Sequence, residues 1–178
     1  MQKLATLALL GSLLAACGND PLDDIKNTKI EGHNVTWAAA AENLSVCKPG
    51  TQQWQLQKEN QGHLAAALFE CELTDQAIAP YNIRLEENIT QDASLMTQTP
   101  MEKVISANLT LKITASQEGN KPLIKIYPKF NNGKKKDSAV VDKQIIRQIL
   151  IEDLNPIERV LPDPPVIHRK FNNQSIFP

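Results

Sequence analysis

The sequence predicts an α+β fold, with an antiparallel sheet of about four to five strands and one main C-terminal helix packed on a face. The first observation is a strict alternation of apolar and polar residues from 105 to 116, which is typical of a strand with one solvated face. The second is an apolar stripe at helical spacing between 137 and 153. The length of 178 residues fits one domain with a single core.

The chain begins with a short apolar segment. Lys3 precedes the stretch 4–14, which at about eleven residues has the length of a signal-peptide core and is too short to span a bilayer. The next residues, Leu14-Ala15-Ala16-Cys17, resemble the lipobox of bacterial lipoprotein precursors. The resemblance implies a signal peptide over 1–16 and diacylglyceryl and N-acyl (palmitate-type) chains on Cys17 that anchor the protein in a membrane. An ordinary signal peptide is the alternative interpretation.

The residue after the anchor indicates the membrane. In enteric bacteria an Asp directly after the acylated cysteine retains a lipoprotein at the inner membrane, whereas this chain has Gly18 there. The resemblance therefore implies the outer membrane, with the protein facing the periplasm. Residues 17–34 comprise the acylated cysteine and a polar stretch, which we expect to form a flexible tether between lipid and domain.

The segment 35–155 is expected to form the single domain. Thr36 can cap a short helix that follows it. Alternation at 53–57 predicts a half-buried strand, and a second strand over 65–73 completes a hairpin. A helix over 64–70 competes with this second strand, because alanine and leucine favour helices.

Three further strands are expected. A weak alternation over 81–87 predicts the third strand of the sheet. The long alternation at 105–115 predicts the next, with its polar side in solvent. The segment 123–130 returns as another strand, and Pro122 and Pro128 favour an edge position for it.

The main helix and a proline-rich tail complete the chain. Asp137 or Ser138 can cap a helix that runs to about Asp153 and ends before Pro156. The tail, 156–178, is expected to be extended, either packed across a sheet edge or serving as a docking peptide for an envelope partner. The buried stripe of the helix is predicted to be Val141, Ile145, Ile146, Ile149, Leu150 and Leu154.

The three cysteines divide into one and two. Once Cys17 is acylated, Cys47 and Cys71 are left, and in an oxidising periplasm the simplest expectation for an even pair is a disulfide. Closing a loop of about 25 residues stabilises a fold by about 3.5 kcal/mol on the chain-entropy model. The alternative is a metal site that His33 or His63 joins, but the paired short cysteine spacings of zinc sites do not occur. We therefore expect neither a metal nor another cofactor.

The sequence does not indicate catalysis or nucleic-acid binding. It contains no Gly-x-Ser-x-Gly, His-Glu-x-x-His or phosphate-binding glycine motif, so we expect that the protein is not an enzyme. A formal net charge of −1 argues against a nucleic-acid surface. Lys134, Lys135 and Lys136 form a basic run, either a solvated turn or a contact with anionic headgroups or lipopolysaccharide phosphate.

Two functional hypotheses follow. The first is a non-catalytic outer-membrane lipoprotein that faces the periplasm and binds or scaffolds an envelope protein partner. The second is a small-ligand or lipid-binding periplasmic module, in which helix and sheet enclose an apolar groove. The second hypothesis requires four aromatic side chains to converge on one pocket: Trp37, Trp54, Tyr81 and Phe130.

Overall fold

The computed structural model describes residues 20–58, 65–90, 102–116, 119–133 and 138–161. It contains one five-stranded sheet in which every neighbouring pair of strands is antiparallel, so the predicted α+β class is confirmed. The strand order in space follows the order in the chain, β1-β2-β3-β4-β5. The strands are β1 Gln53–Lys58, β2 Ala65–Glu72, β3 Val104–Thr114, β4 Lys121–Phe130 and β5 Ser138–Val140.

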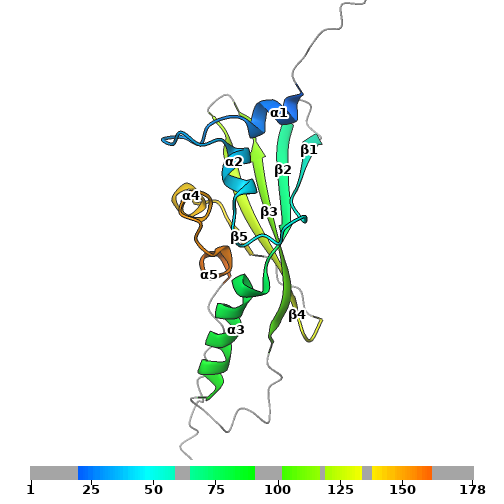
Figure 1. Ribbon diagram of the computed structural model, residues 1–178, viewed down its shortest axis with the longest axis vertical. Coiled ribbons are helices and arrows are strands. Elements are labelled where there is room, and N and C mark those ends of the chain that lie inside the picture. The colour runs from blue at the N-terminus through cyan, green and yellow to red at the C-terminus, as the bar shows by residue number, and fades with distance from the viewer. Residues whose placement is uncertain (1–19, 59–64, 91–101, 117–118, 134–137, 162–178) are drawn as a thin grey trace, which may run out of the picture.

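Helices cover one face of this sheet. Helices α2, α3, α4 and α5 lie on the same side of the strands, and α1 lies at one end of the sheet next to β2 (Figure 1). None of the helices in the described ranges is long and apolar enough to cross a membrane. The helices are α1 Pro21–Lys26, α2 Trp37–Glu42, α3 Asp75–Thr90, α4 Lys143–Ile151 and α5 Pro156–Val160.

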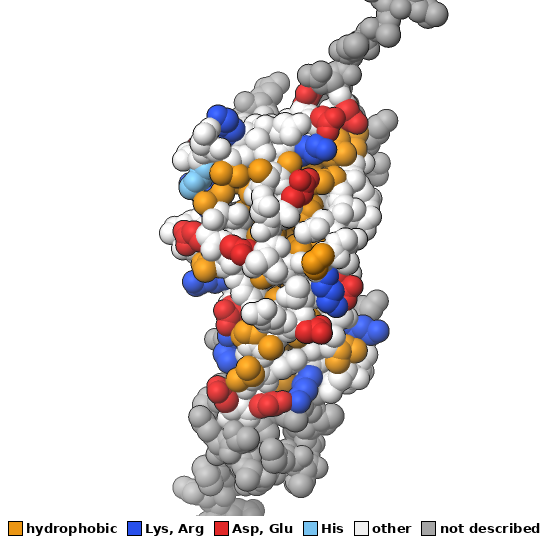
Figure 2. Space-filling model, in the orientation of Figure 1, with side chains coloured by type: hydrophobic (Ala, Val, Ile, Leu, Met, Phe, Trp, Pro, Cys, Tyr) orange, Lys and Arg blue, Asp and Glu red, His pale blue; other side chains and the backbone are white. Residues whose placement is uncertain are grey.

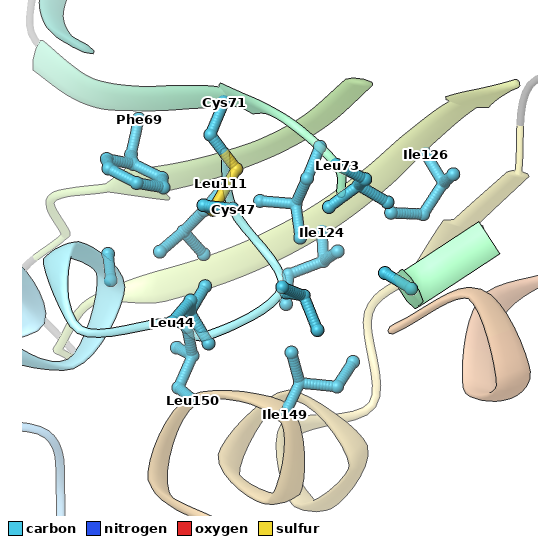
Figure 3. Close-up of a cluster of buried hydrophobic side chains, with 14 of the residues drawn as sticks. Leu44, Cys47, Phe69, Cys71, Leu73, Leu111, Ile124, Ile126, Ile149 and Leu150 are labelled. Carbon is cyan, nitrogen blue, oxygen red and sulfur yellow. A yellow bond between two sulfur atoms is a disulfide. The ribbon is translucent and has the colours of Figure 1, made fainter. Parts of the chain in front are cut away.

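The core fills the space between the sheet and the helices. Leu109, Leu111 and Ile113 of β3 have no exposed surface, and Ile124 of β4 is equally buried beside them. Figure 3 shows these strands contributing side chains toward Leu44, Ile149 and Leu150 on the helical side. The polar side of β3 points the other way, as its alternation predicted.

A disulfide lies within this core. Cys47 and Cys71 are bonded, with Cα atoms 5.7 Å apart, as the sequence predicted. Cys47 lies just before β1 and makes an isolated antiparallel bridge with Leu73, at the end of β2 (Figure 3). The bond therefore ties the segment that leads into β1 to the neighbouring strand.

The predicted hairpin and the helix before it are confirmed. β1 and β2 pair in register from Gln53 opposite Glu70 to Lys58 opposite Ala65, so the competing helix over 64–70 is wrong. Pairing with β3 on the other side of β2 outweighs the helix propensity of its alanines. Thr36 caps α2, where its hydroxyl accepts a hydrogen bond from the Ala39 amide at 3.2 Å.

The predicted third strand is wrong. Residues 81–87 belong to α3, which at 16 residues is longer than the C-terminal helix expected to be the main one. Thr74 begins this helix, since its hydroxyl accepts from the Ala77 amide at 3.2 Å. The short alternation over 81–87 misled because Ile83 is 53% exposed. Extended backwards, the buried positions have helical spacing: Ala77, Ile78, Tyr81 and Leu85.

A bulge changes the first residues of β3. Its register with β4 shifts between Val104 and Ser106, which leaves Ile105 as an extra residue. Ile105, predicted on the buried face, is 53% exposed, and Val104 is buried in its place. Asn82 of α3 holds this point, because its amide donates to the Val104 carbonyl and its oxygen accepts from the Val104 amide, both at 2.9 Å.

The C-terminal helix is shorter than predicted. Ser138–Val140 form β5 instead of its first turn, because they pair with Ile124–Ile126 of β4. The helix begins later, where the Asp142 carboxylate accepts from the amides of Gln144 and Ile145. Val141, assigned to the buried stripe, is 73% exposed for the same reason. The edge position that Pro122 and Pro128 favoured for β4 is wrong, because β4 lies between β3 and β5. Both prolines are tolerated there because β5 pairs only with Ile124–Ile126, between them.

The two ends of the described chain are more ordered than a tether and an extended tail. Within the stretch 17–34, α1 buries Ile25, and Ile30 after it is 2% exposed. At the other end, the Asn155 side chain caps α5 and donates to the Ala77 carbonyl at 2.7 Å, which joins α5 to α3. Ile157 is fully buried. Isolated apolar residues in polar sequence thus attach both segments to the core.

Removal of the disulfide is expected to destabilise the fold without changing it. Replacing both Cys47 and Cys71 by alanine should lower the free energy of unfolding by about 3.5 kcal/mol, because the denatured chain regains the entropy of an open loop. Urea denaturation with and without reductant measures this. Reductant should lower the stability of the wild type to that of the variant and leave the variant unchanged. A reduced wild type as stable as the oxidised protein would contradict the prediction.

The contact between α3 and the bulge gives a second prediction. Asn82→Ala should cost about 2 kcal/mol in urea denaturation, because it removes two hydrogen bonds from a half-buried backbone. Gln76→Ala, at an exposed position of the same helix, is the matched control and should change stability by less than about 0.5 kcal/mol. Equal effects of the two substitutions would show that Asn82 does not hold α3 to the strand.

Candidate functional site: the open face of the sheet

The side of the sheet opposite the helices forms the candidate site, which we call the open face. Strand register brings side chains from distant parts of the sequence into rows across it. No described helix lies on this side (Figure 1). The open face consists of Gln53, Gln55 and Gln57 of β1, Leu68, Glu70 and Glu72 of β2, Asn108, Thr110 and Lys112 of β3, and Leu123, Lys125 and Tyr127 of β4.

The charges on the open face are divided between strands. Glu70 and Glu72 lie on β2, whereas Lys112 and Lys125 lie on β3 and β4. Thr110 stands between Glu70 and Lys125 in one row, and its hydroxyl donates to the Glu70 carboxylate at 3.4 Å. One side of the face is therefore acidic and the other basic, with neutral polar groups between them.

The middle of the open face is hollowed. A depression of about 490 Å³ extends across it from β1 to β4. Leu68 and Leu123 lie in its lining and are each partly exposed, and Tyr127 retains 37% of its surface. These apolar groups would be buried by anything that filled the depression, which is how contact surfaces between proteins gain free energy.

An ion-pair cluster lies at the end of the acidic strand. The Lys48 ammonium lies 2.6 Å from a Glu72 oxygen and 3.8 Å from Asp75. The hydrogen bond to Glu72 raises the pKa of Lys48, partial desolvation opposes this to a smaller extent, and the charges of both carboxylates add to the rise. The Thr51 hydroxyl accepts from the Glu72 amide at 3.1 Å. Glu72 is thus fixed in place at its side chain and at its backbone.

A second depression adjoins the basic side. It also measures about 490 Å³, and Lys112, Lys121 and Lys143 line it together with the exposed Val141. Lys143 lies 3.7 Å from Glu31.

Figure 2 shows that over the side of the molecule in view acidic and basic side chains are interspersed, which is unlike the continuous basic surface of nucleic-acid-binding proteins.

The chain has no match among known proteins. No protein-family model matches it, and no curated protein or solved structure matches it significantly. The functional argument therefore depends on the geometry of the molecule.

The structure brings together only part of the residues singled out in the sequence. Cys47 and Cys71 are joined in the disulfide, so their sulfurs are not metal ligands. His33 is exposed in the turn after Ile30. Across the described ranges, no group of three or more His, Cys, Asp or Glu side chains is placed to hold a metal. Cys17, His63, Lys134, Lys135, Lys136 and most of the tail lie outside the described residues.

The four aromatic residues of the ligand-binding hypothesis do not meet. Trp37 lies beside Pro122 at the start of β4, and Phe130 ends that strand, about 27 Å away at about 3.4 Å per residue. Trp54 packs against Phe69 at 5.2 Å between ring centres. The cavity beside Trp37 measures about 20 Å³, which is far smaller than the 300 Å³ or more typical of ligand pockets.

Sequence reasoning missed the contribution of β4 to the open face. The polar side of β3 was predicted, but β4 carries an equally regular pattern in which Lys121, Leu123, Lys125, Tyr127 and Lys129 alternate with buried residues. The prolines of β4 favoured an edge position, which is wrong, and the exposed side of this strand was not recognised. Glu70 and Glu72 were likewise assigned only to a strand. The register alone places Glu70 in one row with Thr110 and Lys125, and Glu72 in the next row with Asn108 and Tyr127.

Proposed function

We propose that this protein is a non-catalytic, lipid-anchored domain of the bacterial envelope whose open face binds a protein partner. The observation that carries the proposal is the depression on the side of the sheet opposite the described helices, which combines partly exposed apolar groups with charges of both signs. A protein surface with a basic part facing Glu70 and an acidic part facing Lys125 would complement it. Apolar contact with Leu68 and Leu123 would supply affinity at the centre.

A binding role agrees with the location of the buried side chains on one side of the sheet. The inner face of the sheet is occupied by core side chains and the helices cover it, whereas the depression between β1 and β4 lies on the other side. A mixed-charge sheet face with a polar rim resembles the composition of protein interfaces more closely than that of small-molecule pockets, which are mostly apolar. The charges would then determine the orientation of the partner more than the strength of binding.

The membrane anchor is the second part of the proposal. Acyl chains on Cys17 would hold the domain at the outer membrane, facing the periplasm, where the disulfide is stable. The first described residues, in α1, lie at one end of the sheet beside β2 (Figure 1). An anchor entering at that end would leave the open face accessible along its length.

Photocrosslinking in intact cells tests the partner. A photoreactive amino acid at position 108, where Asn108 is exposed on the open face, should give an adduct with another envelope protein after irradiation. The matched control is position 144, where Gln144 is exposed on α4 on the helical side. We expect an adduct from the first position and none from the second, in full-length protein purified with detergent.

Two further results decide the interpretation. Lys125→Glu should weaken the adduct from position 108, because it reverses the basic side of the face, while the level of folded protein stays the same. Recovery of the protein alone at its own mass from position 108 would contradict the proposal. So would equal adducts from both positions, which would indicate random collision.

The anchor has its own test. Cys17→Ala should move the protein from the membrane fraction to the soluble periplasmic fraction, because no acyl chain can be attached. Cys71→Ala is the control and should stay in the membrane fraction, since it changes only the disulfide. A Cys17→Ala protein that sediments with outer membranes like the wild type would rule out lipidation at this residue as the anchor.

A further inference from the structure

The two edges of the sheet differ in how they are protected against further strand pairing. At one edge, β5 has only three residues, and Pro122 and Pro128 flank the part of β4 that it covers. Short strands and prolines are devices that prevent sheets from extending. At the other edge, β1 has six residues and no proline, and it carries no charge from Gln53 to Gln57. No described segment pairs with the outer side of β1.

The side chains of β1 are exposed or only partly buried. Gln53, Gln55 and Gln57 are exposed on the open face, and Trp54 and Leu56 on the helical side are partly buried. The Trp54 indole packs on Phe69 and donates to a Glu42 carboxylate oxygen at 2.9 Å, so it is held in place at the edge. A neighbouring strand would bury the remaining apolar surface of both residues.

The sequence of β1 is complementary to itself in an antiparallel arrangement. If two copies pair about a two-fold axis at Gln55, Gln53 lies opposite Gln57 and Trp54 lies opposite Leu56. Glutamine amides donate and accept hydrogen bonds, so glutamine faces glutamine without penalty. The tryptophan–leucine pairs fall on the helical side, and no charged residue faces another of the same sign.

We propose that two copies of this chain associate through β1, in antiparallel register centred on Gln55. The product is one continuous sheet across two molecules. Because the axis is perpendicular to that sheet, both open faces point to the same side. The proposal does not depend on the partner-binding function, since it concerns backbone pairing at the edge of the sheet, although the side chains of Gln53, Gln55 and Gln57 also border the open face.

Cysteine crosslinking in intact cells tests the register. In full-length Gln55→Cys, the two introduced cysteines face each other, and mild oxidation should give a band at twice the monomer mass on a non-reducing gel. Gln53→Cys is the matched control, because its two copies would be about 14 Å apart along the strands, beyond the reach of a disulfide. Coexpressed Gln53→Cys and Gln57→Cys should again crosslink to each other.

The outcomes show whether a second copy of this chain pairs with the edge strand β1. Equal crosslinking of the Gln55→Cys protein and of the Gln53→Cys protein, each expressed alone, would overturn the proposal. So would the absence of crosslinking in both single variants and in the coexpressed pair. A band joining Gln55→Cys to a different protein, in place of the homodimer, would also overturn it. Gln55→Lys should shift the detergent-solubilised protein from dimer to monomer in sedimentation velocity, whereas Gln144→Lys should not. An unchanged dimer fraction in Gln55→Lys would overturn the register.

Discussion

Strand β3 lies at the centre of the molecule and is hydrogen-bonded along its length to β2 on one side and β4 on the other. Leu109, Leu111 and Ile113 on its inner face are fully buried, and burial of each such side chain contributes about 1.5–3 kcal/mol. The helices are organised around this row: α3 is held at the β3 bulge by Asn82, and α5 is joined to α3 by Asn155. A disturbance of β3 would therefore reach every layer of the fold.

Burial on one side of β3 also determines what the other side can be. With alternate residues committed to the core, Asn108, Thr110 and Lys112 must face outward, and register extends this polar row onto the neighbouring strands. All the described helices that pack on the sheet lie on the inner face, so the outer face has no cover from them. The candidate binding surface is thus a geometric consequence of how the core is built.

The sequence predicted what depends on local pattern. The alternation of β3 covers enough residues to exclude a helix, and the disulfide was predicted from the cysteine count and the expected oxidising compartment. The secondary-structure assignment was wrong where contacts between residues far apart in the sequence determine the structure. The seven residues 81–87 alternate like a strand, yet Asn82 and Tyr81 take helical positions because α3 docks on β3 and α5. The open face could be predicted only in part, because pairing of Glu70, Thr110 and Lys125 requires the strand register.

The disulfide links the core to the segment that leads into the edge strand β1. An edge strand with one neighbour frays more easily than an internal one, since it has half the backbone hydrogen bonds. Cys47 lies just ahead of β1, and its bond to Cys71 fixes the chain beside β2 before the turn at Pro49 and Gly50 begins the strand. Lys48 reinforces this, because its amide donates to the Glu72 carbonyl at 2.7 Å. Strand β1, uncharged from Gln53 to Gln57, is thereby held in place at this edge, whereas at the opposite edge the prolines of β4 and the shortness of β5 limit further pairing.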